Sequence, residues 1–285
     1  MAVVSAAKFN TSISPTWCPG CGNYGIWAAL KQALFELNLE PHQVLISYDI
    51  GCCGNGANFT RTYAFHSLHG RAIPPAVGAK LGNKNLVVIA VIGDGGAYGE
   101  GIQHLIHSAR YNVDITVLVH NNQRFSLTTG QATATTPSKT VTPTTPFGEI
   151  KKPINPLLLS LDSGASFVAR GFANDGQHLA ELIKAAVKHQ GFSHVDILQP
   201  CVSFNKENTN EWYRSVIYKL DSHKYKADNL LRAKEKAEEF EQNGKLPIGI
   251  LYQQERETYE SQIPQLAGEP LCRQSLEGID CLAKL

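Results

Sequence analysis

The sequence has no surplus of charge of either sign. Its 285 residues contain 26 Lys and Arg against 25 Asp and Glu, which leaves a formal net charge of +1. Proteins that bind nucleic acids or anionic membrane surfaces through electrostatic attraction carry a basic excess. The composition therefore argues against nucleic acid and membrane as partners.

Long hydrophobic runs and targeting segments are also missing. The apolar runs stop well short of the about 20 residues that a membrane-spanning helix needs. Residues 1–10 have neither a charged start followed by a long apolar stretch nor a cleavage site of small residues, so we read no secretory signal and expect a cytoplasmic protein. With 43% hydrophobic and 18% charged residues, the chain can fold around a full core.

Short apolar, β-branched runs alternate with helical patterns along the chain. The runs predict strands at residues 44–50, 86–92, 115–119, 195–198 and, more weakly, 166–171. Apolar residues recur at helical spacing over 26–37, 102–109 and 179–187. This alternation predicts an α/β fold with a mostly parallel sheet and helices on both faces, in which ligands bind beyond the carboxyl ends of the strands.

Two segments depart from this pattern. Residues 133–156 contain seven Thr and five Pro, which predicts a long surface loop that either flanks a cofactor or docks a subunit, or is a solvated insertion. From Glu207 onward the pattern changes, with a helix expected over 229–243 that Gly244 ends. We therefore predict a main domain over 1–205 and a C-terminal helical extension and tail over 206–285.

The seven cysteines are an odd number in a long chain without a signal, which disfavours a disulfide framework. Cys18 and Cys21 lie three positions apart in a turn with Pro19 and Gly20, a C-x-x-C pattern shared by zinc sites, iron–sulfur sites and redox dithiols. A thioredoxin-like dithiol expects a helix that starts at its first cysteine. Here the helix is predicted to start near Tyr24, which favours metal ligation.

Further cysteines follow predicted strands. Cys52 and Cys53 come after the strand at 44–50, and Cys201 follows the strand at 195–198. We therefore expect these cysteines to lie at the same carboxyl edge of the sheet. Four cysteines from dispersed loops could hold zinc or a [4Fe–4S] cluster, but a zinc ribbon normally supplies a second C-x-x-C, which is absent. We therefore predict the cluster, and read Cys272 and Cys281 as plain thiols.

A second group of candidate site residues comprises two motifs, Gly93-Asp94-Gly95 and Asn121-Asn122. Each follows an apolar strand, and Asp94 and Asn122 are 28 positions apart, so one strand–helix–strand unit brings their side chains to the same end of adjacent strands. Their oxygens suit Mg²⁺, which binds pyrophosphate, and the glycines leave room for it. Either motif alone would also fit a tight turn or a strand-ending cap, but together they predict a thiamine diphosphate site.

Over about residues 14–205 the chain resembles the β subunit of the 2-oxoacid:ferredoxin oxidoreductases. The matching motifs occur in the order of that family: Trp17-Cys18-Pro19-Gly20-Cys21-Gly22, Gly51-Cys52, His69-Gly70-Arg71, Gly93-Asp94-Gly95, Asn112-Val113-Asp114-Ile115, Asn121-Asn122-Gln123, Thr129-Gly130-Gln131 and Pro200-Cys201-Val202-Ser203-Phe204-Asn205. The resemblance implies that the cluster ligands are Cys18, Cys21, Cys52 and Cys201. It implies that the magnesium ligands are Asp94, Asn122 and the main-chain carbonyl of Arg124, with Gly51, Cys52, Gly93 and Gly95 also contributing to the cofactor site.

The chain departs from the family pattern at Arg124-Phe125-Ser126 and at Thr129, which affects substrate contacts, whereas magnesium needs only the Arg124 backbone. The resemblance favours His69 as a polar group near the thiazolium or the substrate carboxylate, against a structural role. His66 is read as structural. Cys52 aligns with the cysteine of the family, so Cys53 is assigned no ligand role.

The resemblance implies thiamine-dependent oxidative decarboxylation of a 2-oxoacid to acyl-CoA and CO₂, with coenzyme A as co-substrate and electrons passed through the cluster to ferredoxin. A separate α subunit would supply the glutamate that faces the aminopyrimidine and most coenzyme A contacts, in an αβ unit that pairs again. The short β chain favours 2-oxoglutarate, whose extra carboxylate would want Arg61, Arg71 or Arg124. Pyruvate is the alternative substrate. The rival functions are a clusterless thiamine-dependent decarboxylase or synthase and a zinc-stabilised subunit without enzymatic activity.

Overall fold

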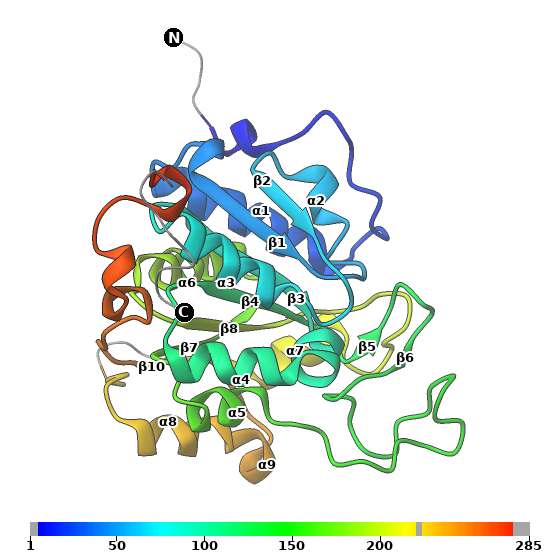
Figure 1. Cartoon of the computed structure of the whole chain (residues 1–285). Coiled ribbons are helices and arrows are strands. Elements are labelled where there is room, and N and C mark those ends of the chain that lie inside the picture. Colours follow the sequence, from blue (N-terminus) through cyan, green and yellow to red (C-terminus); the bar gives the residue numbers. More distant parts are fainter. Residues whose placement is uncertain (1–4, 221–223, 276–285) are drawn as a thin grey trace, which may run out of the picture.

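The computed structural model describes residues 5–220 and 224–275. Within these residues, eight strands form one sheet in the order β2-β1-β3-β4-β8-β7-β10-β9, and β5 and β6 form a separate hairpin (Figure 1). All strand pairs of the large sheet are parallel except β7–β10. The strands are β1 (Val44–Tyr48), β2 (Tyr63–His66), β3 (Val87–Gly93), β4 (Thr116–Asn121), β5 (Arg124–Phe125), β6 (Gln131–Ala132), β7 (Phe167–Phe172), β8 (Ser193–Leu198), β9 (Ile217–Lys219) and β10 (Leu246–Gln253).

Helices cover both faces of the sheet. The helices are α1 (Gly22–Glu36), α2 (Gly56–Phe59), α3 (Ile73–Gly82), α4 (Ile102–Tyr111), α5 (Pro156–Asp162), α6 (Gly176–Lys188), α7 (Asn210–Val216), α8 (Leu230–Ala237) and α9 (Glu239–Asn243). Helices α1 and α6 pack on one face, and α3, α4, α5 and α8 on the other (Figure 1). None of the described helices is long and apolar enough to cross a membrane.

Strand β3 shows why the central strands are apolar throughout. Ile89 and Val91 pack into the core under α1 and α6, while Val88, Ala90 and Ile92 pack into the core on the opposite face. Successive side chains of a strand point to opposite faces, so a strand covered by helices on both sides needs a continuous apolar run. The predicted α/β fold with a mostly parallel, two-sided sheet is confirmed.

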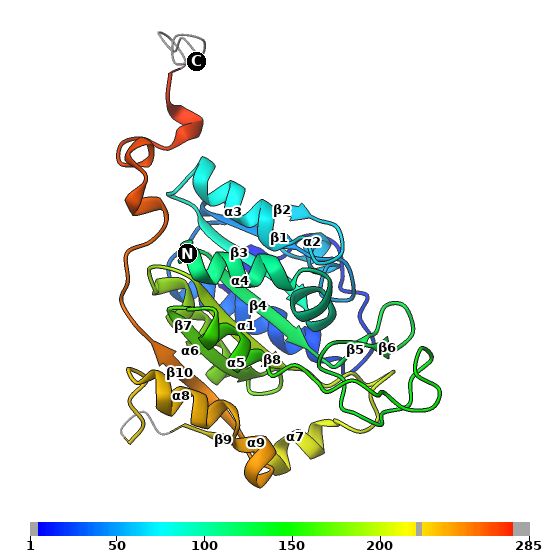
Figure 2. The same ribbon diagram turned by 60° about the horizontal axis from the view of Figure 1, so that its bottom comes forward.

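The five predicted strands are all present, with bounds shifted by a few residues, but the sequence missed β2, β9 and β10 of the large sheet. Strand β10 lies beside β7 (Figure 2), although Pro247 and Gly249 argue against a strand at this position. The segment after residue 206, expected to be a helical extension, thus adds strands to the main sheet. The helix expected over 229–243 is two helices, α8 and α9, that meet at Glu238, and Gly244 ends the second with a φ of 72°.

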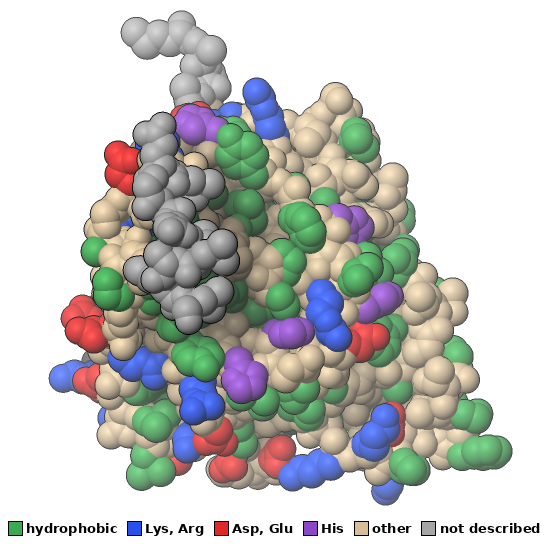
Figure 3. Space-filling model, in the orientation of Figure 1, with side chains coloured by type: hydrophobic (Ala, Val, Ile, Leu, Met, Phe, Trp, Pro, Cys, Tyr) green, Lys and Arg blue, Asp and Glu red, His purple; other side chains and the backbone are tan. Residues whose placement is uncertain are grey.

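The outermost strand, β2, lies at one end of the sheet, and all of its side chains are exposed. On the face seen in Figure 3, acidic side chains lie near basic ones and neither sign forms a large patch, in line with the near-zero net charge.

The carboxyl ends of β1, β3, β4 and β8 lie along one edge of the sheet, since these strands are parallel neighbours. The hairpin β5–β6 and the loop of residues 133–156 project from this same end (Figures 1 and 2). The cysteine and cofactor motifs singled out in the sequence follow these strands or lie in the adjoining turns, so the fold collects them at one edge.

Candidate active site

A cavity at the carboxyl ends of β1, β3 and β4 brings together the residues predicted to bind thiamine diphosphate. Its lining includes Gly51, Cys52, His69, Gly93, Asp94, Gly95, Asn122 and Arg124. These residues come from four separate turns, and parallel strand topology alone explains why they converge.

Asp94 is the acidic group of this cavity and is 1% exposed. Burial raises the pKa of its carboxyl to about 6, against hydrogen bonds from Thr133 and Thr135 that lower it. No Lys, Arg or His of the described chain forms an ion pair with it. A buried carboxylate without a cationic partner is costly, so the donor set fits a bound divalent cation.

Asn122 lies beyond the end of β4, and its side chain organises the next turn. Its Oδ1 accepts a hydrogen bond from the Arg124 backbone N–H at 2.9 Å and lies 3.4 Å from the Ser126 hydroxyl. The turn therefore holds the Arg124 backbone beside the Asn122 oxygen, in the same cavity as Asp94. An amide oxygen, a carboxylate and a main-chain carbonyl are all ligands that suit Mg²⁺.

Two glycines shape the turns that line the cavity. A Cβ atom at Gly95 would lie 2.2 Å from the Phe125 ring, so only glycine lets the hairpin β5–β6 pack against the turn after β3. Gly51 has a φ of +122°, a conformation that residues with a side chain rarely adopt. Gly95 thus lets the Phe125 ring line the cavity, while a Cβ at Gly51 would meet no atom within 4 Å, so the turn after β1 leaves open space beside it.

His69 lies on the wall of the cavity, on a turn that ends at Gly70, whose φ is +66°. Its Nδ1 is 3.3 Å from Oε2 of Glu100, and the ring is half exposed. His66 is an exposed residue of β2 and does not line this cavity.

Asp49 was missed by the sequence analysis, although it directly follows β1. Its side chain is 1% exposed, and burial raises the pKa of its carboxyl to about 6, partly offset by the nearby backbone N–H groups of Ile50, Arg71 and Gly70. Its Oδ1 is buried without a hydrogen-bond partner. The side chain thus lies between the turn that carries Cys52 and the turn that carries His69. In the sequence, an isolated acidic residue two positions before Gly51-Cys52 does not indicate this role.

A second cavity, of about 210 Å³, adjoins the first and is lined by four cysteines: Cys18, Cys21, Cys52 and Cys201. Cys21 is the N-cap residue of helix α1, which starts at Gly22, earlier than predicted. The structure therefore weakens the helix-start argument against a redox dithiol, but it surrounds a cavity with four thiols rather than pairing two.

Polar side chains that the sequence analysis did not single out point at these thiols. Ser126 Oγ is 3.2 Å from Cys201 Sγ, and Ser203 Oγ is 3.2 Å from Cys18 Sγ. Gln199 Nε2 donates to Cys21 Sγ at 3.7 Å, while its Oε1 is buried without a partner. Each donor lies within two residues of a cysteine or within four of Asn122, which is the signal that could have found them.

The thiols repel one another when ionised. Burial, followed by repulsion from the other three thiols of this cavity, raises the pKa of Cys52 to about 12, and burial also raises the pKa of Cys21. A cationic centre in the cavity would reverse these shifts, because thiolates are its ligands.

Within the described residues, no three His, Cys, Asp or Glu side chains converge on the position of a single metal ion. Four thiolates around zinc would each lie about 2.3 Å from it. The four thiols share a cavity of about 210 Å³ with ten other lining residues.

Cys53 does not join the other four cysteines. It is 5% exposed and does not line the second cavity, and burial followed by the nearby Asp49 carboxylate raises the pKa of its thiol well above the usual value. Cys272 is an exposed free thiol, as expected. Cys281 lies outside the described residues.

The two cavities share a wall. Cys52, Asn122, Ser126, Leu127 and Gln199 line both of them. A group bound in the first cavity would therefore lie one side chain away from a group bound in the second.

The loop of residues 133–156 flanks the first cavity at its base. Thr133, Thr135 and Thr136 are buried there, whereas Phe147 and Ile150 near its tip are 100% and 93% exposed. Of the alternatives left open by the sequence, the structure favours a loop that flanks the predicted cofactor site.

The fold is that of a thiamine pyrophosphate enzyme. Residues 49–197 match the family model described as thiamine pyrophosphate enzyme, C-terminal TPP binding domain. Residues 201–268 match the model for the C-terminal part of the pyruvate ferredoxin oxidoreductase beta subunit.

The similarity to individual relatives is more specific than the match to this class of thiamine enzymes. The chain is 43% identical over 261 residues to the 2-oxoacid:ferredoxin oxidoreductase subunit beta of Saccharolobus solfataricus, covering 87% of this chain and 85% of the relative. It is 40% identical over 197 residues to the 2-oxoglutarate oxidoreductase subunit KorB of Mycobacterium tuberculosis, covering 69% of this chain and 53% of the relative.

A solved structure agrees with these relatives. The 2-oxoglutarate:ferredoxin oxidoreductase from Magnetococcus marinus, with 2-oxoglutarate, coenzyme A and succinyl-CoA bound, has a TM-score of 0.87 and 35% identity, covering 91% of this chain and 88% of that chain. The chain therefore belongs to the β subunits of the 2-oxoacid:ferredoxin oxidoreductases, thiamine-dependent enzymes in which it works with an α subunit. The resemblance predicted from the motifs is confirmed.

Proposed function

We propose that this chain binds thiamine diphosphate with Mg²⁺ in the first cavity and a [4Fe–4S] cluster in the second, and that it oxidises 2-oxoglutarate with coenzyme A and ferredoxin. The observation that carries this proposal is the wall shared by the two cavities. Electrons released in one cavity then need to cross only one layer of side chains to reach the other.

In the first cavity, Asp94, Asn122 and the carbonyl of Arg124 hold the magnesium ion. The glycine turns at Gly95 and Gly51 leave backbone groups free for the pyrophosphate. Thiamine diphosphate, when bound, supplies the electron sink for decarboxylation of a 2-oxoacid. His69 is the polar group that we place toward the reacting end, and Glu100 orients its ring.

In the second cavity, Cys18, Cys21, Cys52 and Cys201 ligate the cluster. Four thiols from dispersed segments around one cavity, with no second C-x-x-C of the kind that a zinc ribbon supplies, support a cluster over a zinc ion. Cys53 takes no part, because it lies outside this cavity and near Asp49 and Asp94. Exposed Cys18 lies on the solvent side of the cavity, where electrons would leave for ferredoxin.

The relatives named for 2-oxoglutarate, together with the neighbour solved with 2-oxoglutarate bound, support this substrate. The second carboxylate of 2-oxoglutarate would be bound by a cationic side chain. Of Arg61, Arg71 and Arg124, the one that lines the first cavity is Arg124. We assign the carboxylate contact to it.

The site is completed by the α subunit, with the glutamate that faces the aminopyrimidine and most contacts to coenzyme A, in an αβ unit that pairs again. Both cofactor sites lie on residues of the predicted main domain over 1–205, and the described part of the chain after residue 206 adds β9 and β10 to the sheet of that domain.

The test is to purify the αβ complex anaerobically, measure iron, acid-labile sulfide, zinc and thiamine, and then follow ferredoxin reduction with a panel of 2-oxoacids plus coenzyme A. Iron and sulfide with turnover of 2-oxoglutarate support the proposal. A colourless zinc protein that binds thiamine would indicate a clusterless decarboxylase or synthase. A zinc protein without thiamine would indicate a non-enzymatic subunit, and faster turnover of pyruvate would reassign the substrate.

A further inference from the structure

Thr135 links the long loop to two residues at the strand ends. Its side chain is 4% exposed, and its Oγ1 lies 2.7 Å from Asp94 Oδ2 and 3.1 Å from Asn121 Oδ1. A hydroxyl has one proton to donate. The shorter distance and the charge of the carboxylate direct that proton to Asp94.

Asn121 is itself held in one orientation. Its Nδ2 donates to Asp196 Oδ1 at 2.9 Å, and Asp196 Oδ2 accepts from Arg170 Nε at 3.0 Å. Asp196 and Arg170 are both buried, so this ion pair is a fixed support. Because the amide nitrogen faces Asp196, the amide oxygen must face Thr135, where it is a second and more distant acceptor for the one Thr135 proton.

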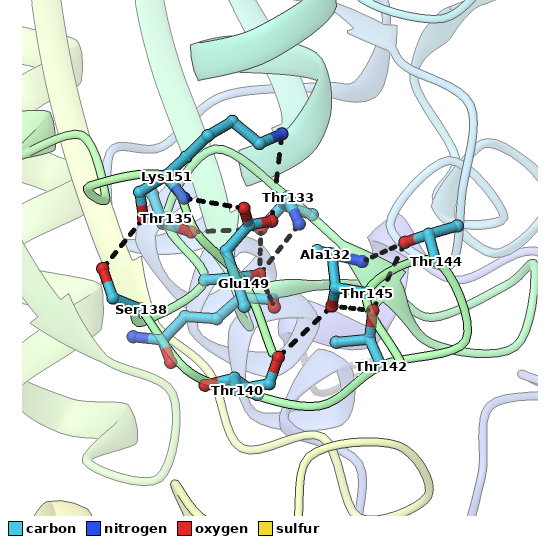
Figure 4. A network of polar contacts seen from close by, with 12 residues as sticks. Ala132, Thr133, Thr135, Ser138, Thr140, Thr142, Thr144, Thr145, Glu149 and Lys151 are labelled. Carbon is cyan, nitrogen blue, oxygen red and sulfur yellow. Dashed lines mark hydrogen bonds and ion pairs between the residues drawn. The ribbon is translucent and has the colours of Figure 1, made fainter. Parts of the chain in front are cut away.

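Two neighbouring threonines fix the base of the loop in the same place. Thr136 Oγ1 donates to the Gln123 carbonyl at 2.7 Å, and the Thr133 backbone N–H donates to Thr136 Oγ1 at 2.8 Å. Thr133 Oγ1 also lies 3.3 Å from Thr135 Oγ1, a cluster drawn in Figure 4. The loop base therefore contacts the turns after β3 and β4, the two that carry Asp94 and Asn122.

We propose that Thr135 is a positioning residue for the magnesium site: its hydroxyl holds one oxygen of the Asp94 carboxylate so that the other faces the cavity. The proposal rests on the proposed role of Asp94 as a magnesium ligand. A carboxylate that binds a metal through one oxygen keeps its geometry through a hydrogen bond to the second, and loss of such a partner costs about 10- to 100-fold in metal affinity.

Binding at Asp94 and order in the loop are then coupled in both directions. If the loop base raises the affinity for magnesium and thiamine diphosphate, the cofactor must stabilise the loop base by the same free energy. The buried half of the loop thus belongs to the cofactor site.

The experiment compares Thr135→Val, which keeps the shape and removes the hydroxyl, with Thr135→Ser, which keeps the hydroxyl. Thr142→Val is the matched control, because the side-chain hydrogen bonds of Thr142 in the described chain go to Thr144 and Thr145 of the same loop (Figure 4), not to Asp94. Each αβ complex is stripped of Mg²⁺ and thiamine diphosphate, and its affinity for both is measured by calorimetry, with the cluster absorbance as a check on folding. We expect about 10- to 100-fold weaker binding for Thr135→Val and affinities near wild type for the other two.

Wild-type affinity in Thr135→Val, or an equal loss in Thr142→Val, would overturn the proposal. In wild type, hydrogen exchange of the amides of residues 133–140 should slow when Mg²⁺ and thiamine diphosphate are added, and unchanged exchange would also overturn it. The variant Asp94→Ala distinguishes failure of the proposed cofactor site from failure of the proposed role of Thr135. If it binds the cofactor normally, the proposed site is wrong, whereas loss in Asp94→Ala with full affinity in Thr135→Val refutes only the role of Thr135.

Discussion

The indole nitrogen of Trp17 donates a 2.7 Å hydrogen bond to the carbonyl oxygen of Cys52, across 35 positions of the chain. This contact fixes the turn of Cys52 against the segment that carries Cys18 and Cys21. Trp17 is 8% exposed and packs edge-on against Phe59 and Tyr24. The thiols of the second cavity are therefore held by the fold before any ligand joins them, which lowers the cost of ordering them around a cluster.

Replacing Cys52 with serine should destroy or degrade the cluster, whereas replacing Cys53 with serine should preserve it. Only Cys52 of this pair lines the cavity shared by the other three thiols, and Cys53 lies near Asp49. Electron paramagnetic resonance of the reduced αβ complexes, with iron analysis, measures this. An intact signal in Cys52→Ser and a missing one in Cys53→Ser would exchange the two assignments.

Removing the carboxylate of Asp94 should abolish magnesium-dependent binding of thiamine diphosphate, and Asn122→Ala should weaken it in parallel. For Asp94→Ala we expect a loss of at least about 100-fold, since partners that only orient a metal ligand are already worth about 10- to 100-fold. Asp162→Ala is the control, because that exposed carboxylate pairs with Lys234 far from the strand ends. Thiamine retained after gel filtration measures the effect, and normal retention in both site variants would refute the assignment.

Loss of a hydroxyl beside a cluster thiol should make the cluster harder to reduce. The hydroxyls of Ser126 and Ser203 lie 3.2 Å from Cys201 and Cys18, and hydrogen bonds to sulfur stabilise the more negative, reduced cluster. Ser126→Ala and Ser203→Ala should each shift the reduction potential to a more negative value in a titration followed by paramagnetic resonance. Ser261→Ala, remote from both cavities in the chain, should not. Unshifted potentials in both site variants would show that these hydroxyls do not reach the cluster.

The chain without its α subunit should not oxidise 2-oxoacids, even when its cluster is complete. The described residues supply one pyrophosphate-type site, and the aminopyrimidine needs a glutamate from elsewhere. Ferredoxin reduction measured before and after addition of the α subunit tests this. Robust turnover by the β chain alone would contradict the half-site assignment.

Acid should destabilise the fold through His194. Burial lowers the pKa of this imidazole from 6.5 to about 4, so between these values the unfolded chain binds a proton that the folded chain does not. The free energy of unfolding should therefore fall as pH drops from about 6.5 to 4, by up to about 3 kcal/mol from this group. Thermal unfolding at several pH values should show a smaller acid loss in His194→Gln, and an unchanged loss would assign it to other groups.

The sequence predicted where the site lies better than it predicted the residues that hold the site's predicted ligands in place. Motifs that follow apolar strands must meet at one edge of a parallel sheet, which is why Asp94, Asn122 and the four cysteines could be grouped in advance. Thr135 could not be placed, because its contact with Asp94 spans 41 positions and depends on the path of a loop without periodicity. Strand β10 was hidden by Pro247 and Gly249. Pro247 precedes the residues that pair with β7 and lies opposite Tyr218 of the short edge strand β9, whereas Gly249 lies opposite Arg170 of β7.

Strand β2 has a practical consequence. It ends the sheet, its only partner strand among the described residues is β1, and Tyr63 and Phe65 are 55% and 52% exposed on it. An edge of unpaired backbone groups with exposed aromatic side chains is a template for strand addition between molecules. Preparations of the β chain alone will therefore tend to self-associate as concentration and storage time increase, so assays of the isolated chain call for dilute protein taken fresh from a sizing column.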